Sequence, residues 1–148
     1  MNETARMIGA EFSSVHLAMR ELVSSLDRSA VNWKPHPEAN SLAVLVAHTL
    51  GSEGEILRAV RGQVANRNRP AEFEVEADAM DLVTMIDRAD ADLEEQISNM
   101  TDDDLTGMRR RGDRPPRPGL DWLVTNYGHA REHLAQMQLT IQLYGAKA

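Results

Sequence analysis

The chain of 148 residues contains no cysteine and only two tryptophans, two tyrosines and two phenylalanines. Without cysteine it has no disulfide framework, no thiolate ligand for zinc and no thiol nucleophile. Its apolar runs are far too short to span a membrane. No charged start leads into an apolar stretch with a small-residue cleavage site, so nothing suggests export. We therefore expect a cytoplasmic protein of one domain, residues 1–148, with a sizeable core.

Positive charge is scarce as well. The net charge of -7 disfavours nucleic acid as the main partner, because binding phosphates requires a positive surface. Residues 72–104 hold thirteen acidic residues and a single basic one, Arg88. The basic stretch MRRRGDRPPRP follows directly, with Arg109, Arg110, Arg111, Arg114 and Arg117. We expect this loop to be solvated or to pair with the protein's own acidic surface. Capture of an anion at the mouth of a pocket is the alternative.

Helical periodicity is what the sequence does contain. Apolar residues recur at steps of three and four, and no segment has the pattern of a strand. Asn40 or Ser41, and then Asp78, can act as N-caps, and Thr101 resembles the cap of a short turn. The proline- and glycine-rich stretches between the apolar stripes are predicted loops. The pattern predicts an all-α four-helix bundle, with helices at Glu3–Asp27, Leu42–Arg61, residues 78–100 and Leu120–Tyr144.

Two histidines four residues apart, His129 and His133, stand in the helical segment YGHAREHLAQMQ. They share a face with Trp122 and Met137, so we expect both imidazoles to point inward. His48, in SLAVLVAHTLGSEGE, also lies on the apolar face of its helix. Buried imidazoles need a partner for each nitrogen, and one shared divalent ion would satisfy all three.

The remaining polar candidates have simpler interpretations. We expect His16 and His36 to be ordinary surface or rim residues. Asn126 and Gln136 flank the histidine pair and can orient the second nitrogen of an imidazole, or hydrogen-bond locally. Trp33 is expected to close one end of the bundle.

The stretch NWKPHPEANSLAVLVAHTLGSEGEI, followed some eighty residues later by WLVTNYGHAREHLAQMQL, resembles the DinB-like (YfiT-like) superfamily of four-helix metalloproteins. The resemblance covers nearly the whole chain. It implies a metal triad of His48, His129 and His133, a nickel or zinc ion, and a homodimer. The better-understood relatives transfer or isomerise with small thiols such as mycothiol or bacillithiol. The resemblance therefore implies a small-molecule substrate such as a low-molecular-weight thiol. We expect no nucleic-acid partner, because of the net charge, and no membrane partner, because of the short apolar runs.

Three functions are compatible with these residues. The first is a metal-dependent enzyme of thiol-linked transfer or isomerisation, since three imidazoles leave a coordination position open. The second is a metal-dependent hydrolase, with Glu55 as the best-placed carboxylate for a base, although it lies two turns from His48. We interpret Glu53 as structural. The third is a non-catalytic helical dimer or binding module in which the histidines simply pack.

Overall fold

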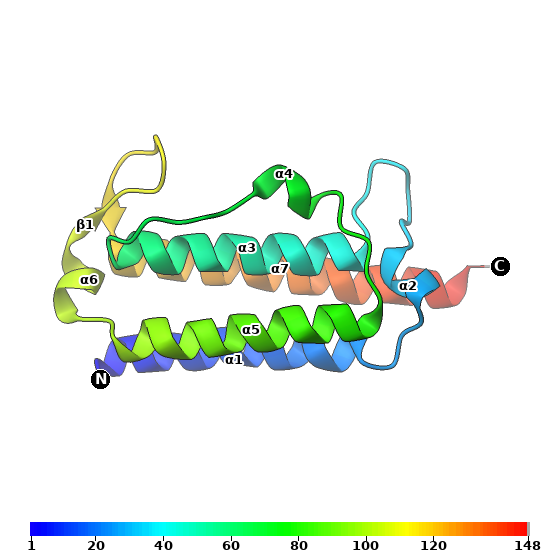
Figure 1. Cartoon of the computed structure of the whole chain (residues 1–148), viewed down its shortest axis with the longest axis horizontal. Helices are drawn as coiled ribbons and strands as arrows, with labels where there is room; N and C mark the ends of the chain where they lie inside the picture. The colour runs from blue at the N-terminus through cyan, green and yellow to red at the C-terminus, as the bar shows by residue number, and fades with distance from the viewer. Residues whose placement is uncertain (148) are drawn as a thin grey trace.

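The computed structural model describes residues 1–147 (Figure 1). Within these residues four long helices lie side by side and form a bundle: α1 (Glu3–Val23), α3 (Leu42–Val60), α5 (Ala79–Ser98) and α7 (Gly119–Ala146). Three short helices connect them, α2 (Arg28–Asn32), α4 (Arg69–Glu72) and α6 (Asp102–Thr106). Strands β1 (Met108–Arg109) and β2 (Arg117–Pro118) form a two-residue antiparallel pair. The predicted all-α four-helix bundle is confirmed.

Side-chain caps set the starts of several helices where the sequence placed them. The Ser41 hydroxyl accepts a hydrogen bond from the Val44 N–H at 3.1 Å, which makes Ser41, rather than Asn40, the N-cap of α3. Asp78 and Asp81 form a capping box at the start of α5. Thr101 begins the short helix α6 in the same way.

Other predicted boundaries were wrong. The first helix ends at Val23 rather than Asp27, because the Asp27 carboxylate accepts from the Ala30 N–H and starts the separate helix α2. The predicted loop 62–77 contains α4, which Asn68 caps. The last helix continues past the predicted stop at Gly145 to Ala146.

The order of the helices around the bundle decides where the connections run. Helix α1 packs against α5 and α7, and α3 packs against the same two helices. Figure 1 shows α1 and α7 running in one direction and α3 and α5 in the other. Because α3 and α5 are parallel, the segment between them must return along the whole bundle. That return carries α4 along the outside of α3.

Two clusters of buried apolar side chains fill the bundle, one toward each end. One contains Val15, Met19, Leu42 and Met137, and the other contains Phe12, Ile56, Leu123 and Trp122. Trp33 packs edge-on against Tyr144 with ring centroids 5.5 Å apart, in keeping with its expected place at the end of the bundle.

Two methionines that continue the apolar repeat of their helices do not face inward. Met7 and Met80 are 59% and 71% exposed, because each lies near the start of its helix, at the edge of the apolar stripe. None of the helices described is both long enough and apolar enough to cross a lipid bilayer.

Candidate metal centre

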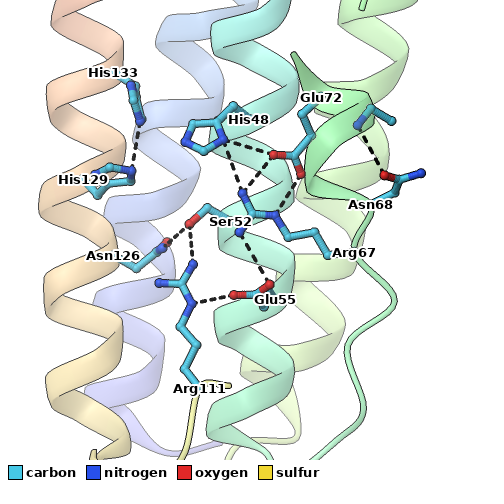
Figure 2. A network of polar contacts seen from close by, with 11 residues as sticks. His48, Ser52, Glu55, Arg67, Asn68, Glu72, Arg111, Asn126, His129 and His133 are labelled. Carbon is cyan, nitrogen blue, oxygen red and sulfur yellow. Dashed lines mark hydrogen bonds and ion pairs between the residues drawn. The ribbon is translucent and has the colours of Figure 1, made fainter. Parts of the chain in front are cut away.

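Three histidines from two facing helices meet beside a cavity. His48 comes from α3, and His129 and His133 stand one turn apart on α7. The His48 ring centroid lies 5.9 Å from that of His129 and 5.0 Å from that of His133. One nitrogen from each ring can be chosen so that all three lie within 4.8 Å of one another. The predicted meeting of these side chains across the two helices is confirmed (Figure 2).

The rings differ in their access to solvent. His48 is buried, with 9% of its surface exposed, and His133 is half-buried. The His129 side chain is 45% exposed. The prediction that both histidines of α7 point away from water was therefore wrong for His129. The reason is that the face of α7 it occupies borders an open cavity rather than the packed core.

The buried carboxylate of Glu72 forms a hydrogen bond with His48 and orients its ring. The Nδ1 atom of His48 lies 3.0 Å from Glu72 Oε1, and Arg67 donates two hydrogen bonds of 2.9 Å to the same carboxylate. A carboxylate paired with Arg67 only accepts, so Nδ1 of His48 carries the hydrogen and Nε2 keeps its lone pair. Burial lowers the pKa of His48, and the bond to Glu72 offsets this only in part, so the ring is neutral near pH 7.

A hydrogen bond to Gln136 orients the His133 ring in the same way. Its Nδ1 atom donates to Gln136 Oε1 at 2.9 Å, leaving Nε2 to face His129 Nε2 at 3.0 Å. Burial, followed by the neighbouring His133 and His48, lowers the pKa of His129. Gln136 thus orients an imidazole as expected, whereas the Asn126 amide donates to Ser52 Oγ at 2.9 Å.

His48 and His129 border a cavity of about 1060 Å³ between α3, α7 and the loop after β1. Ser52, Asn126 and Trp122 are buried beside it, and Glu55 projects into it. Arg111 reaches back to Glu55 at 2.5 Å and to Ser52 Oγ at 3.1 Å (Figure 2). Burial would raise the pKa of Glu55, but Arg111 and Arg67 outweigh burial and lower it.

His16 is the clearest error of the sequence interpretation. It was expected at the surface, yet its side chain is fully buried between Glu53 Oε2, at 2.8 Å from Nε2, and Asp90 Oδ1, at 2.9 Å from Nδ1. The signal was present in the sequence, since His16 stands four residues after Phe12 and three before Met19 on the inward face of α1. Glu53 is structural, as predicted. His36 is exposed in its loop and does not line the cavity.

Arg67 and Glu72 are the site residues that the sequence interpretation missed. Both lie in the stretch predicted to be an ordinary loop, and no local pattern distinguishes Glu72 from the other acidic residues around it. The basic loop behaves partly as expected. Arg109 pairs with Asp103 at 2.9 Å, and Arg117 pairs with Asp121 at the same distance.

A bundle of four long helices with three histidines gathered between two of them defines the class of this protein, a helical bundle with a candidate metal centre. The family model of the DinB superfamily matches residues 11–137. The chain belongs to this superfamily, as its sequence predicted. A search among curated proteins finds no match.

Solved structures show the same fold. A DinB-like protein from Bacillus cereus is 19% identical, with a TM-score of 0.78 over 93% of this chain and 91% of that one. A conserved protein from Enterococcus faecalis is 17% identical, with a TM-score of 0.80 over 99% of each chain. A DinB-like protein from Bacillus subtilis is 18% identical, with a TM-score of 0.75 over 96% of this chain and 94% of that one.

Proposed function

We propose that this protein is a divalent-metal-dependent enzyme that acts on a small molecule, with His48, His129 and His133 as the metal ligands. The observation that carries the proposal is the convergence of three imidazole nitrogens within 4.8 Å at the wall of a cavity of about 1060 Å³. A structural metal site is normally closed by four protein ligands, whereas three ligands beside a cavity are typical of catalytic sites.

The donor set fits such an ion. A tetrahedral ion about 2.1 Å from each nitrogen would need nitrogens roughly 3.4 Å apart. The three nitrogens lie within 4.8 Å of one another, which is close to that spacing. The lowered pKa values of His48 and His129 favour the neutral rings that a metal requires. Zinc and nickel both accept imidazole, and we propose one of these two.

The chain's own residues orient the ligands. Glu72, itself held by Arg67, presents Nε2 of His48 to the centre, and Gln136 does the same for His133. Supporting hydrogen bonds of this kind fix the tautomer and direction of metal-ligating histidines. A bound ion would act as a Lewis acid with one position open to a substrate atom.

Thiol-linked transfer or isomerisation is the reaction class that we propose, on the resemblance to the thiol-using relatives. The chain has no cysteine, so any sulfur must come with the substrate. Hydrolysis is the weaker candidate. It needs a general base, and Glu55, the best-placed carboxylate for that role, already forms ion pairs with Arg111 and Arg67. Their charges lower its pKa, which makes it a poor proton acceptor at neutral pH. The homodimer and the cytoplasmic location stay predictions.

Metal titration of the untagged protein tests the proposal. The wild type should bind one Zn²⁺ or Ni²⁺ per chain. His133→Ala should weaken binding more than about 100-fold, since loss of a ligand exceeds the effect of losing a supporting residue. Arg131→Ala is the matched control, because Arg131 is exposed on the same helix, and it should bind as the wild type does.

Two outcomes would overturn the proposal. If the wild type binds no metal at pH 7.5, or if His133→Ala binds as tightly, the histidines are packing residues of a binding module. Turnover of electrophilic small molecules by the metal-loaded protein, with and without added thiols, then separates the transferase from the hydrolase.

A further inference from the structure

The cavity beside the histidines concentrates positive charge in a chain whose net charge is -7. Three carboxylates border it: Glu55, Asp113 and Glu132. The arginines that border it outnumber them; they are Arg67, Arg69, Arg110, Arg111 and Arg114. The lining therefore carries a net positive charge even when His48 and His129, the two histidines that border it, are neutral.

Two of the five arginines are engaged by the protein itself. Arg67 pairs with Glu72 and Glu55, and Arg111 pairs with Glu55 and Ser52. The side chains of the other three form no ion pair or hydrogen bond with any residue from 1 to 147. These three are Arg69, whose guanidinium lies 5.2 Å from the Phe73 ring centroid, Arg110 and Arg114.

The loop that carries Arg110 and Arg114 is anchored on both sides of Arg110. Before it, the Arg109 side chain donates to the Val60 carbonyl at 2.7 Å, and the Arg109 carbonyl accepts from Trp122 Nε1 at 2.9 Å. After it, Arg111 is held by Glu55 at 2.5 Å. The chain then reverses, because Gly112 adopts a φ of 58° and the Arg114 N–H donates to the Arg111 carbonyl at 3.2 Å.

The anchored turn places Arg110 and Arg114 at the same cavity with no partner of their own. Unpaired guanidinium groups that line a cavity attract anions, and their planar forks match a carboxylate. Acidic residues do lie near this loop, since Asp103 and Asp104 of α6 pair with Arg109 and Asp113 lies in the loop itself, but none of these three pairs with Arg110 or Arg114.

We propose that Arg110 and Arg114 bind a carboxylate of the substrate, whose reacting end points toward His48, His129 and His133. Calling this ligand the substrate rests on the proposed metal function, but the anion site itself does not. Arg69, which also borders the cavity, provides a further cation for a ligand with a second negative group.

NMR titration of the metal-free protein tests the anion site. Succinate is the probe, succinamide is its neutral counterpart of similar size, and inorganic phosphate tests the other anion class. Succinate should shift the resonances of residues 110–114 and succinamide should not. The double variant R110Q/R114Q should bind succinate about tenfold more weakly, as expected for two partly exposed charge pairs.

R88Q is the matched control, because Arg88 is exposed on α5, outside the cavity. It removes one positive charge and should bind succinate as the wild type does. The proposal is overturned if R110Q/R114Q and the wild type bind succinate equally, including the case of no binding by either. Phosphate bound tenfold more tightly than succinate would overturn the carboxylate assignment.

Metal titration of the same variants keeps the two proposals apart. R110Q/R114Q should bind Zn²⁺ as the wild type does, since neither arginine contacts the histidines or their supporting residues. A wild type that binds succinate through these arginines but binds no metal would refute the enzyme proposal and leave the anion site standing. Both arginines are outside the core, so circular dichroism should show an unchanged fold.

Discussion

The Glu72 carboxylate packs directly against Gly51 of α3. A methyl group added there by Gly51→Ala would lie 2.0 Å from Glu72 Oε2, 2.7 Å from its Cδ and 3.4 Å from Arg67 Nε. No carbon and oxygen atoms pack at 2.0 Å, so the carboxylate must move. Its movement breaks the hydrogen bonds that hold it to Arg67 and His48.

Two magnitudes follow from this geometry. Replacing glycine by alanine inside a helix ordinarily stabilises a protein by up to about 1 kcal/mol. Gly51→Ala should show no such gain in the free energy of unfolding, or should be less stable than the wild type, because each broken hydrogen bond to a charged group costs about 1.5–3 kcal/mol. Loss of the carboxylate behind His48 should also weaken metal binding about 10- to 100-fold, which is about 1.4–2.7 kcal/mol.

Gly54→Ala is the matched control on the same helix. Its added methyl group would meet only Arg58 Nη1, at an ordinary 3.7 Å. It should therefore gain stability and bind metal as the wild type does. Urea unfolding of the metal-free proteins and competitive Zn²⁺ titration check both quantities. If Gly51→Ala gained as much stability as Gly54→Ala and kept the wild-type affinity, Glu72 would not be held against α3 as described.

Two further substitutions test the interior and a helix start. His16→Gln should destabilise the metal-free protein by about 3 kcal/mol at pH 6, because it leaves the buried Glu53 without its partner. Burial alone would lower the pKa of His16, but Glu53 and Asp90 outweigh burial and raise it. The stabilisation is therefore full below about pH 6.5 and declines as pH rises through the raised pKa. A gap in unfolding free energy between His16→Gln and the wild type that is constant or wider at pH 9 would contradict this. Ser41→Ala should lower the free energy of unfolding by about 1 kcal/mol, because it removes the N-cap of α3, while Asn40→Ala should lower it little. If urea unfolding showed equal losses for the two variants, Ser41 would not be the N-cap.

The sequence alone determined the bundle and the meeting of the three histidines. Apolar steps of three and four residues and caps such as Ser41 and Asp78 act within a few residues, so local pattern contains them. Spacing of four on one helix fixes His129 and His133 on one face. The apolar side of α3 then turns His48 toward them.

Tertiary structure decided everything that depends on residues far apart in the chain. Glu72 reaches His48 across 24 positions, because α3 and α5 run parallel and their connection must return along the outside of α3. His16 finds Glu53 across 37 positions inside the bundle, a pairing that makes its burial tolerable. The exposure of His129 was likewise set by the loop after β1, which leaves a cavity over that face of α7. Periodicity tells which face of a helix is apolar, but the neighbours that complete a polar site come from the packing of distant segments.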